Sequence, residues 1–238
     1  MYMMLYNPYF YFDSTYILVI IGMLLSLLAS GKVKTTFSKY SKVRSMSGLT
    51  GEETAGRILR NSGIYDVRIE RISGDLTDHY DPRSKTLRLS DSVYNNTSVA
   101  AIGVAAHECG HAIQHDKGYI PLKLRGAFVP VANFGAAAAW PIILVGILLG
   151  ESQSLITFGI ILFSAAVLFQ IITLPVEFNA SRRAVRILDD TGILAESEIK
   201  GTKKVLTAAA LTYVAGAAAS ILQLLRLILL FGGRRRND

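Results

Sequence analysis

The residues best suited to chemistry in this sequence form one short motif, His107-Glu108-Cys109-Gly110-His111. On a helix, residues four apart lie on one face, so the imidazoles of His107 and His111 can reach a single zinc ion. Glu108 lies about 100° around the same helix, close enough to contact a zinc-bound water without binding the metal. Zinc lowers the pKa of such a water toward ~7, and a neighbouring carboxylate can pass its proton to a leaving amine. The motif therefore predicts a catalytic zinc site with Glu108 as the general base.

The alternative interpretation is an amphipathic helix whose two histidines are only structural. Three features favour the metal site. The motif contains two of the four histidines of the chain. Its flanks are small and apolar, as a buried helix requires (Ala100, Ala101, Ala105 and Ala106). Gly110 adjoins the second histidine, where a bulky side chain could block approach to the metal. Cys109 is the single cysteine, which excludes an intrachain disulfide and a zinc site made of cysteines.

A catalytic zinc usually has three protein ligands and one open position, so a third ligand is expected. Glu177 is the strongest candidate, because it follows an uncharged run of 25 residues, where an ionisable group usually has a partner. Its other interpretation is a carboxylate at a helix N-terminus, just after Pro175. His79, in a loop, is a weaker candidate as a ligand and a better one as a residue beside the ligands or the substrate. His115 continues the helix face by four residues, too far along the axis, and fits a polar helix end.

The composition is that of a membrane protein with one sizeable extramembrane region. Charged residues make up only 18% of the 238 residues, against about a quarter in a typical soluble domain. The net charge of +7 is distributed in blocks, with fifteen Lys and Arg residues from Lys32 to Arg125 and none between Arg125 and Arg182. Basic residues gathered in alternate loops are typical of membrane topology. No aromatic-basic motif accompanies them, so we expect no nucleic-acid partner.

Four hydrophobic segments are expected to lie in the lipid bilayer. Residues 1–30 form the first transmembrane helix, with an aromatic interface belt in place of a signal peptide's basic region (Tyr2, Tyr6, Tyr9, Phe10, Tyr11, Phe12 and Tyr16). Residues 126–176 form a transmembrane hairpin, whose two uncharged runs are separated only by Glu151. Residues 205–238 contain a fourth hydrophobic segment, interrupted at Arg226, and a basic tail.

Residues 31–125 are expected to form a soluble α+β region that contains the zinc-binding helix. Its predicted elements are a capped helix at Thr50–Asn61, strands at Val67–Ile72 and Thr86–Leu89, and a helix at Ser98–His115. Residues 177–204 are expected to supply the third-ligand helix and a loop. The predicted fold class is mainly α, a multi-pass helical membrane protein with a small α+β zincin-like metallopeptidase domain.

Counting basic residues predicts the orientation of the chain in the membrane. The positive-inside rule places residues 32–125 and 182–204 on the cytoplasmic side, with the N-terminus and the hairpin turn outside. Two spans separate His111 from Glu177, so both emerge on the same side. A complete fourth span would place Arg234–Arg236 outside, against the rule. Two alternatives stay open: the last segment does not cross cleanly, or the tail lies at the interface.

The sequence resembles the YugP family of bacterial membrane zinc metallopeptidases over nearly the whole chain. The strings that carry the resemblance are His107–His111, Glu177–Arg182, Leu76–Pro82, Val129–Asn133 and Ala208–Ala215. The sequence is more distantly similar to HtpX-like and CAAX-prenyl proteases, a gluzincin-like resemblance that implies Glu177 as the third ligand. Those relatives place Asp where this chain has Ser181, so the carboxylate expected to orient a zinc-bound histidine is absent. Asp78, Asp81 and Asn179 are candidates to replace it.

The first functional hypothesis is a membrane-embedded zinc metallopeptidase with one Zn²⁺ per chain. It would cleave peptides or membrane proteins by zinc-activated water at the cytoplasmic face of the bacterial plasma membrane. His79 and Tyr213 are candidates to donate a hydrogen bond to the oxyanion of the tetrahedral intermediate. The strand Thr86–Leu89 could pair with an extended substrate, by analogy with other zinc peptidases.

The alternative hypothesis is a non-catalytic membrane scaffold or adaptor that keeps the zinc-binding helix for structure. Such a protein has no use for the carboxylate of Glu108, which favours catalysis. A metal transporter would need ionisable residues inside several spans, and the hairpin lacks them. A homo-oligomer or a membrane partner is compatible with the sequence, which identifies neither.

Overall fold

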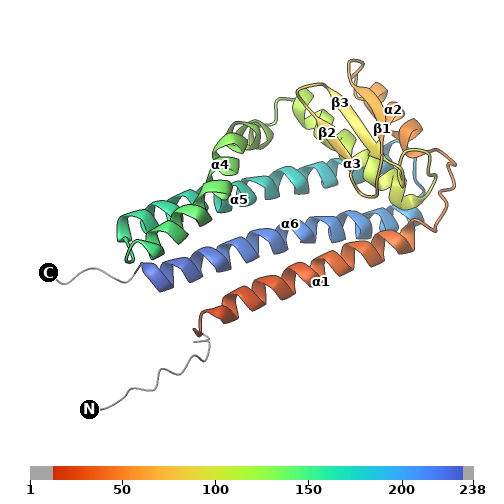
Figure 1. The fold of residues 1–238 in the computed structure, drawn as a ribbon. Helices are drawn as coiled ribbons and strands as arrows, with labels where there is room; N and C mark the ends of the chain where they lie inside the picture. The colour runs from red at the N-terminus through yellow and green to blue at the C-terminus, as the bar shows by residue number, and fades with distance from the viewer. Residues whose placement is uncertain (1–12, 233–238) are drawn as a thin grey trace, which may run out of the picture.

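Helices dominate the computed structural model, which describes residues 13–232 (Figure 1). In chain order the elements are α1 (Tyr16–Tyr40), α2 (Gly51–Asn61), β1 (Arg68–Ile72), β2 (His79–Asp81), β3 (Thr86–Ser90), α3 (Val99–Asp116), α4 (Ile120–Leu148), α5 (Gln153–Asp190) and α6 (Glu196–Phe231). This is the predicted mainly α fold with a small sheet. The aromatic residues at positions 2–12 and the tail Arg234–Arg236 lie outside the described residues.

Four helices, α1, α4, α5 and α6, are long and apolar enough to cross a membrane, in agreement with the four predicted hydrophobic segments. All of them extend beyond the predicted apolar runs. The longest, α5, has 38 residues and continues past Pro175 and Glu177 to Asp190. Residue 177 is therefore not the start of a separate element, because Glu177 lies within the helix that forms the second arm of the hairpin.

Arg226 interrupts the apolar run of the last segment, as the sequence indicates, but it does not end the helix. Helix α6 continues through this residue to Phe231. The guanidinium has partners at the start of α1: its Cζ lies 4.2 Å from the centre of the Tyr16 ring, and Nη2 lies 4.0 Å from a carboxylate oxygen of Asp13. An arginine with an aromatic and an anionic neighbour can stay in an apolar helix.

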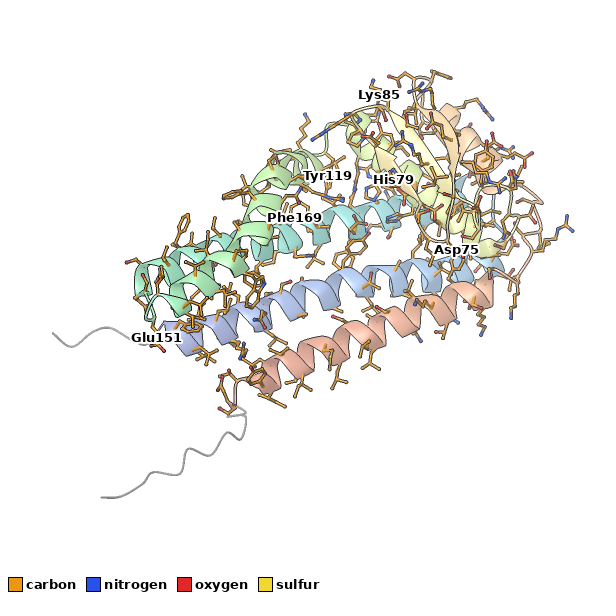
Figure 2. The ribbon with its side chains drawn as sticks, in the orientation of Figure 1. Asp75, His79, Lys85, Tyr119, Glu151 and Phe169 are labelled. Atoms are coloured by element: carbon orange, nitrogen blue, oxygen red, sulfur yellow. The ribbon has the colours of Figure 1, made fainter. Side chains whose placement is uncertain are left out.

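The long helices meet at one end of the molecule, here called the hairpin end. Gln153, at the start of α5, donates a hydrogen bond to the carbonyl oxygen of Phe231, at the end of α6. Figure 2 shows Glu151 of the α4–α5 turn at this end, and His79 and Lys85 at the opposite end. The opposite end, here called the sheet end, holds the three strands and α3 beside the last turns of α5 (Figure 1).

The three strands form one sheet in the order β1-β3-β2. Strand β3 pairs in parallel with β1 and antiparallel with β2. The strand predicted at Thr86–Leu89 is thus confirmed as β3, but the expectation that it pairs with substrate is wrong, because both of its edges are occupied. The predicted loop around His79 is also wrong. Residues 79–81 form β2, an edge strand, in which Tyr80 pairs with Leu87.

A capping box starts α2 as the sequence predicts. The Thr50 side chain accepts a hydrogen bond from the backbone N–H of Glu53 (3.2 Å), whose carboxylate accepts one from the backbone N–H of Thr50 (2.8 Å). This reciprocal pair satisfies two backbone donors that a helix start would otherwise leave free. Helix α2 then packs on α3 through a core that also includes β3 and the end of α5 (Ile58, Leu87, Leu89, Ile102 and Leu188).

Helices α3 and α5 approach each other closely at Gly110. A Cβ atom on this residue would lie 2.7 Å from the carbonyl oxygen of Ala180 and 3.1 Å from its Cα. Contacts below 3.0 Å do not occur between real Cβ atoms and backbone, so α5 fits here only against a glycine. The structure therefore gives Gly110 a role that the sequence did not predict. It makes room for the helix that carries Glu177.

The substitution Gly110→Ala is expected to lower stability by about 1–3 kcal/mol, because the added methyl group must push α5 away from α3. The measurement is the thermal unfolding midpoint of the purified protein in detergent. Gly31→Ala is the matched control, since a Cβ there has nothing within 4 Å and alanine favours a helix. An equal or higher midpoint for Gly110→Ala would contradict the packing argument.

Candidate metal centre

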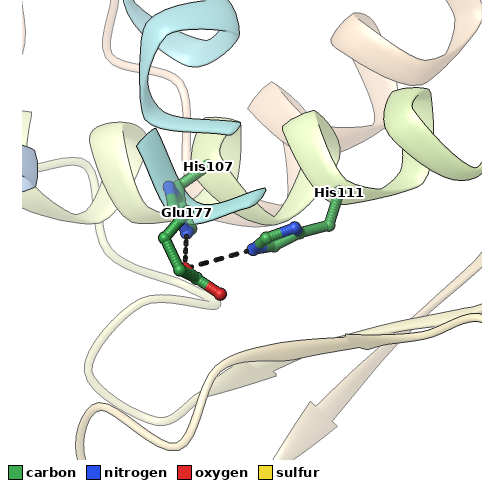
Figure 3. Close-up of side chains that lie close together, drawn as sticks. All are labelled: His107, His111 and Glu177. Atoms are coloured by element: carbon green, nitrogen blue, oxygen red, sulfur yellow. Dashed lines mark ion pairs between the residues drawn. The ribbon is translucent and has the colours of Figure 1, made fainter. Parts of the chain in front are cut away.

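Three side chains converge between α3 and α5, as Figure 3 shows. The Nε2 atoms of His107 and His111 lie 3.3 Å and 3.5 Å from the same carboxylate oxygen of Glu177, Oε2. The three ligand atoms lie within 4.8 Å of one another. Within residues 13–232 this is the one group of three or more His, Cys, Asp or Glu side chains that could hold a metal ion.

The two helices set this geometry. His107 and His111 lie one turn apart on α3, with ring centres 4.8 Å apart and ring planes nearly perpendicular. Glu177 comes from α5, and only 2% of its surface is exposed. A buried carboxylate is costly unless other groups compensate its charge. Its surroundings therefore decide whether the cluster is stable.

Arg125 compensates part of this charge. Its Nη1 donates a hydrogen bond to Glu177 Oε1 at 3.0 Å, which leaves Oε2 directed at the imidazoles. Arg125 lies in the first turns of α4, where the chain enters the membrane hairpin. Glu177 lies on α5 where the chain leaves the hairpin, so both residues are at the same side. The Glu177 carboxylate is thereby held with Oε1 bonded to Arg125 and Oε2 facing the two imidazoles.

Gln114 determines which ring nitrogen of neutral His111 carries the hydrogen. The Val176 carbonyl can only accept, so the amide nitrogen of Gln114 faces it at 2.8 Å. The amide oxygen then faces His111 Nδ1 at 3.0 Å, which requires the hydrogen of a neutral imidazole to lie on Nδ1. The lone pair is left on Nε2, the atom that points at Glu177. This is the tautomer that a metal ligand needs.

Ser181 is the partner of the other histidine. Its Oγ lies 3.1 Å from His107 Nδ1, so a hydroxyl stands where the resemblance described above implies an Asp. Of the three candidates to replace that Asp, Asn179 acts only indirectly: its Oδ1 accepts from Gln114 Nε2 at 3.0 Å.

Asp78 and Asp81 do not contact either histidine, which corrects the expectation that one of them replaces the missing Asp. The Asp78 carboxylate accepts from the backbone N–H and hydroxyl of Ser90. Asp81 accepts from the backbone N–H of Arg83 and the hydroxyl of Ser84. Asp78 therefore ties the residue before β2 to the end of β3, and Asp81 holds the turn after β2, so the carboxylates of both are engaged there.

The donor set fits a divalent metal. Glu177 Oε2 is buried and has no hydrogen-bond donor among the described residues. Two imidazole nitrogens and this oxygen can each donate an electron pair. These three atoms thus lie close together and face one point. Zinc binds such N and O ligands tetrahedrally, and three of them leave a fourth position open. Cys109 does not take part: it is fully buried, and burial raises the pKa of its thiol above the usual range.

A cleft of about 450 Å³ opens beside the cluster. Glu108, His111 and Glu177 line one side of it, the segment 78–83 that contains β2 lines another, and Tyr213 contributes from α6. The cleft therefore brings the predicted base, two of the predicted ligands and the edge strand together.

The remaining histidines are outside the metal cluster. His79 lines the cleft, but its Nδ1 lies 2.9 Å from the Thr77 carbonyl oxygen and its Nε2 3.5 Å from Arg88 Nη1. His115 Nδ1 lies 2.8 Å from the hydroxyl of Tyr80. Burial raises the pKa of Tyr80 to about 12, so its hydroxyl stays protonated at neutral pH. The Tyr80–His115 contact thus ties the edge strand to α3.

Sequence reasoning did not find Gln114 or Arg125. Gln114 is fully buried and follows His111 by three residues, which places the two side chains on neighbouring turns. Arg125 is the last charge before the hairpin, and Glu177 is the first charge after it, with only Glu151 at the hairpin turn between them. Since both residues flank the same pair of spans, they emerge at the same side of the membrane. Their opposite charges could therefore have indicated that they form an ion pair.

Comparisons with known proteins agree with this geometry. A family model described as "Putative neutral zinc metallopeptidase" matches residues 15–232. The chain is 53% identical over 221 residues to the "Putative membrane protease YugP" of Bacillus subtilis (strain 168), covering 92% of this chain and 98% of that protein. No solved structure matches the chain. Both matches include the long helices as well as the metal centre.

Replacing Gln114 with Leu is expected to weaken zinc binding by about 10- to 100-fold, because His111 loses the acceptor that fixes its tautomer. Gln114→Glu should weaken binding less, since its carboxylate still accepts from Nδ1 although the Val176 carbonyl loses its donor. Zinc affinity is measured by competition with a fluorescent chelator. Wild-type affinity in Gln114→Leu would exclude this role.

Proposed function

The chain belongs to the family of putative neutral zinc metallopeptidases, and on that premise we propose that it is a membrane-embedded peptidase with Glu108 as its general base. The observation that carries the proposal is the cleft in which Glu108 lies beside His111 and Glu177. The proposed substrates are peptides or membrane proteins, since the site lies at the end of membrane helices.

The proposed ligands of one zinc ion are His107, His111 and Glu177. Zinc bound by them would lower the pKa of a water molecule in the fourth position and polarise the substrate carbonyl. The Gln114 and Ser181 contacts keep both imidazoles oriented toward Glu177. Arg125 keeps one oxygen of Glu177 away from the cluster and the other within it.

Glu108 is the proposed acid and base. It is buried, with 7% of its surface exposed, and it lines the cleft one residue from a proposed ligand. In this role its carboxylate takes the proton of the attacking water and passes it to the leaving amine. The alternative of a non-catalytic scaffold gives this cleft-facing carboxylate no task.

Tyr213 is the better of the two proposed oxyanion donors. It lines the cleft together with Glu177, and a phenol is a suitable donor to a developing negative charge. His79 lines the same cleft, but its ring nitrogens already face the Thr77 carbonyl and the Arg88 guanidinium. Moving His79 into an oxyanion role would break both contacts.

Strand β2 is the proposed binding edge for an extended substrate. It is one of the two edge strands of the sheet, and residues 78–83 line the cleft. An extended peptide adds to a free strand edge through backbone hydrogen bonds, with little dependence on its side chains. This arrangement of an edge strand beside a metal-binding helix supports the zincin-like character expected from the sequence.

The proposed location of the site is the cytoplasmic surface of the bacterial plasma membrane. Helix α5 has 38 residues, or about 57 Å of length, which exceeds a bilayer's apolar thickness of about 30 Å. Its last turns therefore extend beyond the bilayer with the metal centre. The basic residues of 32–125 and 182–204 lie at this sheet end, which the positive-inside rule assigns to the cytoplasm.

Glu108→Gln is expected to lower hydrolysis by about 10²- to 10⁴-fold with wild-type zinc content, because the amide cannot take a proton. His107→Ala is expected to lose the zinc as well. The measurements are metal content and the peptides released from a solubilised bacterial membrane fraction, identified by mass spectrometry. Glu151→Gln, at the hairpin end, is the matched control. Wild-type cleavage by Glu108→Gln would refute the mechanism, and no cleavage by wild type would favour the scaffold.

Tyr213→Phe is expected to lower kcat by about 10²- to 10³-fold on a substrate found in that experiment, while KM changes little, because only the proposed transition-state hydrogen bond is lost. The His79→Ala variant serves as the comparison and should retain most of the kcat. If the two variants show the reverse order of loss, His79 rather than Tyr213 is the donor.

A further inference from the structure

A second surface feature lies between α1 and α6, on residues that the metal centre does not use. The two helices run antiparallel side by side (Figure 1), with Gly22 packed on Ala219 and Gly201 packed on Tyr40. Two hollows follow this helix pair, and both are lined by Lys32 and Leu211. Because they share these residues, the hollows form one continuous surface, here called the α1–α6 groove.

The half of the groove nearer the sheet end is basic. It has a volume of about 550 Å³, and its walls carry four lysines together with threonine hydroxyls (Lys32, Lys39, Lys203 and Lys204). None of these four ammonium groups forms an ion pair with a carboxylate within residues 13–232. The Nζ atom of Lys39 lies 5.7 Å from the centre of the Tyr40 ring. Four uncompensated positive charges in one hollow favour an anionic ligand.

The other half of the groove is apolar. It has a volume of about 450 Å³ and is lined mainly by aliphatic side chains of α1 and α6. Leu25, Leu28 and Leu211 are 40%, 70% and 43% exposed there. Lys32, where the two halves meet, is the first charged residue after the apolar run of α1. The groove therefore crosses the boundary between the hydrocarbon of a bilayer and its headgroups.

We infer that the α1–α6 groove binds an anionic phospholipid, whose phosphate lies among Lys32, Lys39, Lys203 and Lys204 and whose acyl chain follows the apolar half. Lysine ammonium groups bind phosphate as point charges, and basic pockets between transmembrane helices hold anionic headgroups. A zwitterionic lipid would bring its own cation against the four lysines. A second copy of this chain would bring four more lysines, so charge complementarity favours the anionic lipid.

The test compares the double variant Lys32→Gln/Lys204→Gln with Arg186→Gln/Lys200→Gln. Arg186 and Lys200 are exposed residues near the sheet end that line neither hollow, so the control removes the same charge. The full-length protein in detergent is titrated with dioleoylphosphatidylglycerol, dioleoylphosphatidylcholine or glycerol 3-phosphate. The readouts are the unfolding midpoint and the number of lipids retained in native mass spectra.

The expected result is a raised midpoint and one retained lipid with phosphatidylglycerol, in the wild type and in the control. The Lys32→Gln/Lys204→Gln variant should bind this lipid roughly tenfold more weakly or worse. Three outcomes would overturn the inference: equal retention by this variant, an equal effect of phosphatidylcholine, or the whole effect from glycerol 3-phosphate. A dimer mass without lipid would instead assign the groove to a second copy and would also overturn it.

Discussion

The close approach of α3 and α5 at Gly110 is the constraint on which the metal centre depends. The ligand atoms come from two helices that belong to different parts of the molecule, one beside the sheet and one rising from the membrane hairpin. Their separations of 3.3 Å and 3.5 Å tolerate little displacement of either helix. A side chain at Gly110 would meet the backbone of Ala180, which cannot rotate away. The packing of α3 against α5 therefore determines the positions of the ligand atoms.

The polar groups around the ligands strengthen the same contact. One short stretch of α5, residues 176–181, supplies the Val176 carbonyl, the Glu177 carboxylate and the Ser181 hydroxyl to partners that include both histidines. Gln114 returns from α3 to the same stretch. Buried polar groups stabilise a unique arrangement when all of them have partners. Here the hydrogen bonds of Gln114 and Ser181 orient the two imidazoles, and Glu177 Oε2, which has no donor among the described residues, faces them.

The sequence was sufficient for features that depend on local periodicity. The four-residue spacing placed His107 and His111 on one helix face, the uncharged runs located the membrane helices, and the charge at their end indicated Glu177. Features that depend on distant pairing were missed or wrong. Strand β2 has only three residues and no alternation to detect, and the central position of β3 follows from its pairing with β1 and β2, which strand periodicity alone does not specify. The partners of Arg226 were not found, because they belong to the start of α1.

The long helix α5 has a consequence for biosynthesis. Two of the three ligand residues precede the hairpin in the chain, and the third follows it. A nascent chain that has not yet inserted α4 and α5 therefore holds both histidines without the carboxylate, which is still far away in the uninserted segment. Assembly of the ligand set and insertion into the bilayer become one event. In the proposed peptidase the metal site would be complete only after insertion into the bilayer, so a chain that has not inserted would lack the proposed activity.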